Sequence, residues 1–260
     1  MFFPSRDTFY ALAEKGNLIP VYREIMADMD TPVSAFRKLD DGKFSYLLES
    51  IEGGEKWGRY SFLGSNPSTI IRSKGSLVET ISDGVTVTQE SADPLACIKE
   101  LLAQFKPVEV DGLPRFFGGA VGYLGYDMVR HFESLSSEKP ALLDAYDSYF
   151  LITDTIVIFD TMRQKIKVVS NAHVTGSISA AEAYDSATAR IEAIIARLLA
   201  PLPLQDSVPL KEPVQFLSNM NAWFCIGICT QIRRTGSFAD GRRRYVFCFF
   251  DFACYGKMAR

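Results

Sequence analysis

Apolar and polar residues alternate along the chain with two periods, one typical of strands and the other typical of helices. Short runs of aliphatic, aromatic and β-branched residues are bounded by Gly, Asp, Asn and Pro, which predicts strands joined by turns. Between these runs, apolar residues recur at helical spacing. We expect strands at residues 18–25, 44–51, 59–64, 69–74, 77–82, 85–88, 148–159 and 164–170, and helices at 6–14, from 31 onward, 94–105 and 177–200.

Capping residues mark where several of these helices begin. Ser5 precedes the first helix, and Asp93 with Pro94 supplies a cap and a first-turn proline for the third. The longest helix, 177–200, is predicted by an apolar stripe with charged residues on its other faces. The stripe consists of Ile191, Ile194, Ile195, Leu198 and Leu199.

This order of elements predicts an α+β fold with helices on a largely antiparallel sheet. Turns at Lys74-Gly75 and Asp83-Gly84 make residues 69–88 a meander, and residues 164–170 are expected to pair with the end of the strand at 148–159. Prolines end the last helix and indicate a linker. We therefore divide the chain into an amino-terminal domain at 1–200, a linker at 201–220 and a divergent tail at 221–260.

The stretch 117–127, FGGAVGYLGYD, has a functional and a structural interpretation. A phosphate loop would need a Lys-Ser or Lys-Thr pair or the dinucleotide glycine spacing, and the stretch has neither. The favoured interpretation is a strand whose glycines let it approach a neighbour closely.

Residues 44–64 hold the most informative candidate chemistry. Two strand-like runs flank a glycine-rich turn and predict a hairpin carrying Glu49, Arg59 and Ser61. If both strands are buried, the carboxylate of Glu49 needs a cationic partner, because an unpaired buried ion is costly. Arg59 is the candidate within the chain, and the ammonium group of an amino-acid ligand is the external candidate.

Three motifs resemble the anthranilate synthase component I family, the chorismate-using enzymes that open tryptophan biosynthesis. The first is Leu-Leu-Glu-Ser at 47–50 followed by Arg-Tyr-Ser-Phe-Leu-Gly at 59–64. The second is the glycine-rich stretch 117–127, and the third is Phe-Leu-Ser-Asn-Met at 216–220. The resemblance covers residues 1 to about 220, the amino-terminal region of the family.

The resemblance implies an allosteric feedback site for L-tryptophan. By position in the motif, Glu49 would accept from the ammonium group, Ser50 would bond the polar end of the ligand, and Leu48 would contact the indole. Arg59 and Ser61 are assigned to the same site with a weaker claim, because they can act by orienting it.

The resemblance also implies the family reaction, in which chorismate and ammonia or glutamine give anthranilate and pyruvate. A glutamine amidotransferase subunit, component II, is the family's partner, and magnesium is held by the carboxy-terminal half. We expect this chain to be truncated, to lack that half, to contain no catalytic or metal site and no cofactor, and to be inactive as a lyase by itself. The alternatives are a non-catalytic tryptophan-binding fragment and the related aminodeoxychorismate synthase component I of folate synthesis.

Composition is that of an ordinary globular protein, with 47% hydrophobic and 23% charged residues. The apolar runs are too short for a membrane span, and the first residues lack the charged and then apolar regions of a secretory signal peptide. We therefore expect a cytoplasmic protein. The two histidines, His131 and His173, have no nucleophile in a recognisable arrangement, and we interpret them as surface or loop residues, with His173 in a polar turn.

The last 40 residues differ from the rest in charge and cysteine content. Residues 221–260 hold six Arg and one Lys against two Asp, and four of the five cysteines lie there. A zinc site is disfavoured by loose spacing, and one cluster, Arg242 to Arg244, is slight evidence for nucleic acid. The favoured hypothesis is a frameshift, because shifting an assumed GGN CGN CGN CGN reading by one base restores an Ala, Gly, Asp or Val run that family members carry.

Overall fold

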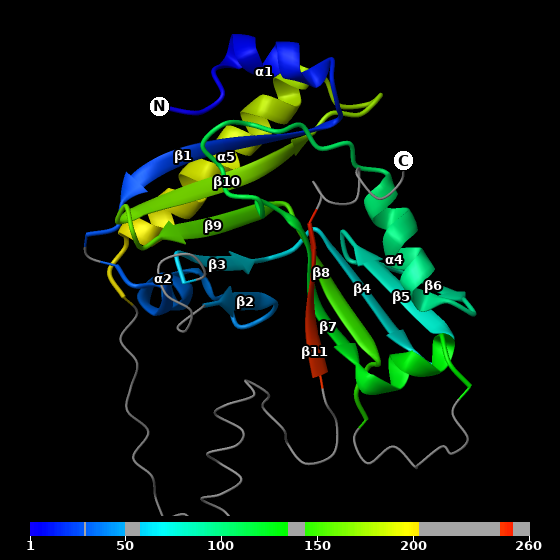
Figure 1. Ribbon diagram of the computed structural model, residues 1–260. Helices are drawn as coiled ribbons and strands as arrows, with labels where there is room; N and C mark the ends of the chain where they lie inside the picture. The colour runs from blue at the N-terminus through cyan, green and yellow to red at the C-terminus, as the bar shows by residue number, and fades with distance from the viewer. Residues whose placement is uncertain (29, 50–57, 135–143, 203–244, 252–260) are drawn as a thin grey trace, which may run out of the picture.

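The computed structural model describes residues 1–28, 30–49, 58–134, 144–202 and 245–251, and it confirms the predicted α+β class. Two antiparallel sheets carry helices on their faces (Figure 1). The helices are α1 (Arg6–Ala13), α2 (Pro32–Leu39), α4 (Pro94–Ala103), the 3-10 helix η1 (Tyr126–His131) and α5 (Ala180–Leu199). The strands are β1 (Leu18–Met26), β2 (Ser45–Leu48), β3 (Tyr60–Ser65), β4 (Thr69–Lys74), β5 (Leu77–Ser82), β6 (Val85–Glu90), β7 (Gly119–Gly125), β8 (Ser148–Thr153), β9 (Thr155–Asp160), β10 (Lys165–His173) and β11 (Tyr245–Asp251).

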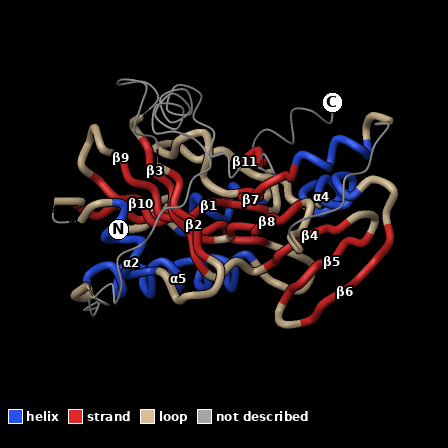
Figure 2. Tube along the Cα trace, turned by 90° about the horizontal axis from the view of Figure 1, so that it is seen from below, coloured by secondary structure: helices blue, strands red, loops and turns tan. Residues whose placement is uncertain are grey.

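The first sheet has the strand order β1-β10-β9-β3-β2, and α1, α2 and α5 cover one of its faces. Figure 2 shows α2 and α5 along that face. β9 and β10 are buried along nearly their whole length. The face of the sheet that the helices cover is largely apolar, with Val157, Ile166 and Val168 in its core. Ile191 and Ile195 of α5 pack in the same core as Phe9 of α1 and Val168 of β10. The predicted apolar stripe of α5 is its core contact for four of its five residues, and the prediction for Leu199, at the end of the helix, is wrong because this residue is exposed.

Side-chain caps fix where these helices begin. Ser179 and Glu182 form a capping box at the start of α5, with a 2.9 Å bond from the Ser179 N–H to Glu182 Oε2. Thr31 and Ser34 make the equivalent arrangement on α2. The predicted caps Ser5 and Asp93 are confirmed, since the side chain of each accepts from the first helical turn.

The second sheet has the order β11-β7-β8-β4-β5-β6, and α4 covers one face of it. Ile98 and Leu102 of α4 pack on Ile71 and Phe150 of the sheet. The meander β4-β5-β6 is confirmed, with Asp83 and Gly84 both at positive φ in its second turn. Within the predicted tail, β11 pairs with β7 along the far edge.

The expected single strand at 148–159 is wrong in one respect, because it is two strands in different sheets. Asp154 separates β8 from β9. Its backbone carbonyl accepts from the Asn171 N–H at 2.7 Å, so the hydrogen bonds of the chain pass at this residue to a strand of the first sheet. The Asp160 to Lys165 hairpin that follows is confirmed.

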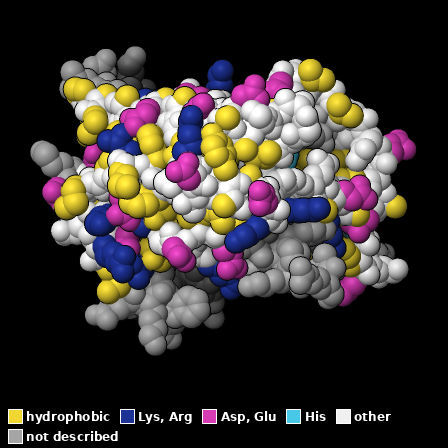
Figure 3. Space-filling view, turned by 90° about the horizontal axis from the view of Figure 1, so that it is seen from above, with side chains coloured by type: hydrophobic (Ala, Val, Ile, Leu, Met, Phe, Trp, Pro, Cys, Tyr) yellow, Lys and Arg dark blue, Asp and Glu magenta, His cyan; other side chains and the backbone are white. Residues whose placement is uncertain are grey.

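Surface charge on the face seen in Figure 3 is mixed. Lys and Arg side chains lie among Asp and Glu side chains there, and neither sign forms a separate field. Among the described residues, no helix is long and apolar enough to cross a membrane.

The glycine-rich stretch 117–127 contains β7, which confirms the structural interpretation. A Cβ atom added at Gly122 would lie 1.9 Å from the Tyr149 carbonyl oxygen and 2.7 Å from Phe150 Cα. Both obstacles belong to the neighbouring strand β8, so a side chain at this position can fit only if the sheet deforms.

We therefore expect Gly122→Ala to lower the free energy of unfolding by about 2 kcal/mol or more, the cost of overpacking against backbone. Urea denaturation followed by circular dichroism measures the change. Gly176→Ala is the matched control, because a Cβ there meets nothing within 4 Å. Equal denaturation midpoints for the two variants would contradict the prediction.

Candidate functional site

The candidate site lies where β2 ends at the edge of the first sheet. β2 pairs antiparallel with β3, with Leu48 opposite Phe62, so the predicted hairpin pairing is confirmed. β2 is half-buried throughout, and Glu49, the residue after it, is exposed. Ser50 lies outside the described residues.

The expectation that Glu49 lies buried in a strand is wrong, because this residue is exposed. The carboxylate is in contact with solvent, so it does not need an internal cation to offset desolvation. The expected alternative, a structural pair between Glu49 and Arg59, is wrong, because the guanidinium of Arg59 is engaged by another carboxylate.

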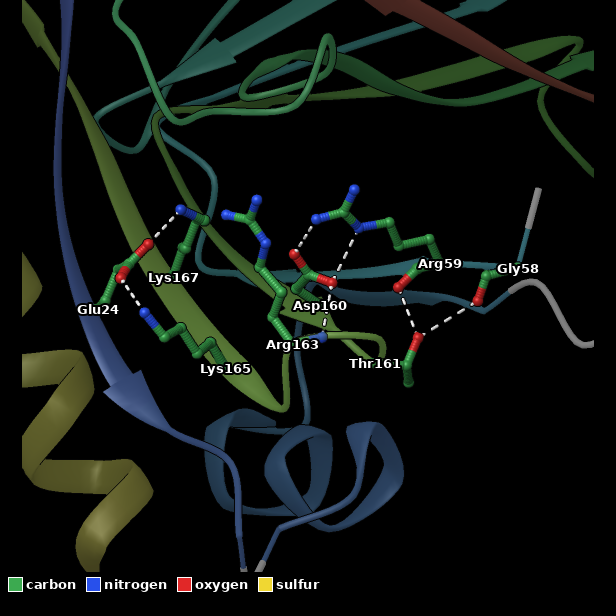
Figure 4. A network of polar contacts seen from close by, with 8 residues as sticks. All are labelled: Glu24, Gly58, Arg59, Asp160, Thr161, Arg163, Lys165 and Lys167. Atoms are coloured by element: carbon green, nitrogen blue, oxygen red, sulfur yellow. Dashed lines mark hydrogen bonds and ion pairs between the residues drawn. The ribbon is translucent and has the colours of Figure 1, made fainter. Parts of the chain in front are cut away.

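That carboxylate belongs to Asp160, the last residue of β9 (Figure 4). Arg59 Nε donates to Asp160 Oδ1 at 2.9 Å and Nη2 donates to Oδ2 at 2.6 Å, a bidentate arrangement. The Arg163 N–H adds a bond of 3.2 Å to Oδ1. Arg59 also lies over the ring of Tyr60, with its Cζ 4.8 Å from the ring centroid.

The environment of Asp160 acts on its ionisation in two directions. The side chain is 1% exposed, and this burial raises the pKa. The hydrogen bonds from Arg59 and from the backbone of Arg163 outweigh burial, so the pKa of Asp160 lies below its usual value. The same bond raises the pKa of Arg59. Asp160 is thus a carboxylate held ionised between two arginines.

Sheet register determines which side chains share a face with Leu48. Leu48 pairs with Phe62, Phe62 with Ile158, Ile158 with Lys167 and Lys167 with Glu24. Side chains of directly opposed residues project to the same face, so these five form one row across the sheet. The row lies on the face away from α5, and it begins apolar and ends charged.

The charged end of this row is a compact network. Glu24 accepts from Lys165 at 2.9 Å and from Lys167 on its other oxygen (Figure 4). Hydrogen bonds from Lys167 and then Lys165 lower the pKa of Glu24. Lys167 is 3% exposed, and its ammonium lies 5.0 Å from the centroid of the Tyr22 ring. The sequence analysis did not identify Asp160, Glu24 and Lys167 as site residues. Charged residues at alternate positions of a predicted strand, such as Lys165 and Lys167, could have indicated a polar cluster on one face of the sheet.

Ser61 lies on the other face of β3. Its neighbour Leu63 packs in the core under the helices, and Ser61 has the same strand parity and is 4% exposed. Leu48 and Phe62 project to the opposite face. The structure therefore brings Leu48, Glu49 and Arg59 to one end of the sheet, and the Ser61 hydroxyl projects to the face opposite Leu48.

Sequence comparison finds several relatives of one name. Anthranilate synthase component 1 of Acetivibrio thermocellus is 38% identical over 199 residues, 76% of this chain and 40% of the relative. The protein of the same name from Pseudomonas aeruginosa is 41% identical over 211 residues, 80% of this chain and 42% of the relative. That of Aquifex aeolicus is 45% identical over 159 residues, 61% and 32% of the two chains.

The chain belongs to the anthranilate synthase component I family. It spans about 40% of the length of the curated relatives it matches. No family model matches the chain. A crystal structure of anthranilate synthase component I from Streptococcus pneumoniae aligns with 69% of this chain and 37% of its own at 24% identity, with a TM-score of 0.46.

A small pocket in this chain, a member of the anthranilate synthase component I family, lies beside the candidate site, between the two sheets. Tyr46, two residues before Leu48 on the same face of β2, lines it, and the pocket has room for about one water molecule. The Tyr46 hydroxyl is buried without a hydrogen-bond partner among the described residues, and burial raises its pKa above the usual range despite the nearby Thr153 hydroxyl. Thr153 Oγ1 itself bonds the N–H and the carbonyl of Gly119, each at 3.1 Å.

Two further groups of titratable residues lie on other elements than β2 and β3. His173 is the last residue of β10 and lies against the Phe105 ring at 5.0 Å, so its expected polar turn is wrong, and burial lowers its pKa. Asp127 and Arg130 of η1 form a local ion pair at 3.3 Å. Among the described residues, no group of three or more His, Cys, Asp and Glu is arranged to hold a metal ion.

The lowered pKa of Asp160 predicts how stability depends on pH. Because the folded pKa lies below the unfolded value of about 3.9, the ionised carboxylate stabilises the fold above that pH, and this contribution is lost as pH falls through the folded pKa. Asp160→Asn should lower the melting temperature at pH 7 and flatten its decline between about pH 5 and pH 2.

Melting curves across that pH range measure the effect. The control is Asp83→Asn, an isosteric change at an exposed turn residue. If Asp160→Asn and the wild type lose the same number of degrees on acidification, Asp160 is not the carboxylate responsible.

Proposed function

We propose that this chain is the tryptophan-sensing part of an anthranilate synthase component I of tryptophan biosynthesis. The proposal rests on kinship with relatives of that name, at 38% to 45% identity, and on the motif Leu-Leu-Glu-Ser at 47–50. The observation that carries it is the end of β2, where a half-buried Leu48 is followed by an exposed Glu49.

The chemistry of this strand end suits an amino-acid ligand. Amino-acid sites combine an apolar wall with a few placed polar groups, and Leu48 with Phe62 supplies such a wall beside the carboxylate of Glu49. Glu49 is available to accept from an ammonium group because it is exposed and because Arg59, the cation expected as its partner, is bound by Asp160. We propose Leu48, Glu49 and Ser50 as ligand residues.

Arg59 and Ser61 take supporting roles in this proposal. Arg59 is fixed by two bonds to Asp160 and so holds the start of β3 in place below the ligand wall. Ser61 faces the helix-covered core, where its effect on a ligand would pass through the position of β3.

Isothermal titration calorimetry with L-tryptophan tests the ligand role. We expect Glu49→Ala to weaken binding at least about tenfold, because the charge-assisted bond to the ligand ammonium is lost. Glu133→Ala, at another exposed glutamate, is the matched control and should bind as the wild type does. Equal affinities for wild type and Glu49→Ala would remove Glu49 from the site. If the wild type shows no heat of binding at millimolar tryptophan, the proposal is overturned.

For the family reaction we propose that this chain regulates and does not catalyse. Chorismate conversion and magnesium binding would then belong to parts of the family protein that this chain does not match, and a component II glutaminase would be the partner of the whole enzyme. A cytoplasmic location stays a prediction from the sequence.

The chain by itself should form no anthranilate from chorismate and ammonia in the presence of magnesium. Fluorescence of anthranilate measures product, and a full-length relative, such as the Pseudomonas aeruginosa protein, is the positive control in the same assay. Turnover above the uncatalysed rate would show that this chain carries its own catalytic groups.

A further inference from the structure

Strand β6 is the outermost strand of the second sheet, and all six of its residues are exposed (Figures 1 and 2). It pairs with β5 on one side, and no strand of the described residues pairs with its outer edge. Val85 and Val87, at 63% and 60% exposure, add two apolar side chains on one face of this edge. Such an edge presents unpaired backbone donors and acceptors to any strand that can reach it.

Within the described part of the chain, the edge lacks the features that normally prevent strand addition. Residues 85–89, VTVTQ, contain no charge and no proline, and their pairing with β5 runs without a bulge. Four of these five residues are β-branched, which favours the extended conformation. Natural edges are usually protected by a lysine, a proline, a bulge or a covering element.

Turn geometry determines which backbone groups face outward. Asp83 and Gly84 form a two-residue turn between Ser82 and Val85, and the pair that closes such a turn is hydrogen-bonded inward. Alternation along an antiparallel strand then directs Val87 toward β5 and leaves the N–H and C=O groups of Thr86 and Thr88 on the free edge.

We infer that this edge associates with the same edge of a second copy of the chain, in antiparallel register about a two-fold axis at Val87. In that register Thr86 faces Thr88 of the second copy, and both residues have outward N–H and C=O groups, so the hydrogen-bonding parity is satisfied. Val87 faces its own counterpart in a non-hydrogen-bonded pair, where side chains approach most closely.

The charges are compatible with this self-pairing. Glu90 is the one ionised side chain on β6, and the two-fold register places it opposite Gly84, away from its own counterpart. Asp83 likewise falls opposite Ser91. Like charges directly opposed across strands would oppose association, and here none are opposed. Two sheets would become one continuous sheet with a closed two-fold interface.

Sedimentation velocity of the full chain over a range of concentrations tests the inference. The wild type should show a monomer–dimer equilibrium, and Val87→Lys should raise the dissociation constant at least about tenfold, since two ammonium groups would meet at the axis. Val87→Glu should do the same alone, and an equimolar mixture of the two variants should restore dimers. Met162→Lys, at a position 59% exposed in the β9–β10 turn, is the control and should dimerise as the wild type does.

Hydrogen exchange provides a second readout that does not depend on assembly size. The amides of Thr86 and Thr88 should become protected as concentration rises in the wild type and should stay unprotected in Val87→Lys. A wild type that is monomeric at every concentration would overturn the inference. A dimer that survives Val87→Lys, or assembly beyond two copies, would assign association to another surface and overturn it equally.

Discussion

A buried carboxylate at the end of the central strand of the first sheet constrains the whole candidate site. Asp160 ends β9, which pairs with both β10 and β3, so the carboxylate enters a region with little access to water. A charge in such a place must be paired and hydrogen-bonded. The bidentate bond from Arg59 meets that need and fixes the residue before β3, which in turn carries the register with β2 and Leu48.

This constraint changes what Arg59 does. The motif that contains Arg59 suggests a ligand contact, but its guanidinium donors are directed to Asp160. Arg59 supports the end of the sheet, whereas Glu49 is exposed and is the residue that we propose for contact with the ligand. Such a rigid support matters because binding groups must be held in position before the ligand arrives.

The two sheets play different parts. The first is covered by three helices on one face and packs a second apolar cluster on the other, beside the charged pair of Lys167 and Glu24, so its strands are held on both sides. The second is held by α4 over its central strands, and its edge at β6 extends beyond that cover. Asp154 is the single residue between β8 and β9, where the chain passes from one sheet to the other, and burial raises its pKa. The second sheet thus ends at β6, whose outer edge pairs with no strand of the described residues.

The sequence by itself determined the local elements and the family. Capping residues, helical stripes and turn pairs such as Asp83-Gly84 act over a few positions, so the helices, the meander and the β9–β10 hairpin could be predicted from them. Motif order predicted the kinship that the relatives bear out. Local pattern could not show that one apolar run at 148–159 serves two sheets, because that depends on which strand Asp154 meets.

Only the tertiary structure decided the partners of the charged residues. Asp160 lies 101 positions from Arg59, and Glu24 lies 143 from Lys167, so no spacing rule could join them. Register then decided that Leu48 and Lys167 share a face while Ser61 faces the core. The physical reason is the same in each case: strand pairing brings distant residues together, and the cost of burying an unpaired charge selects which of them meet.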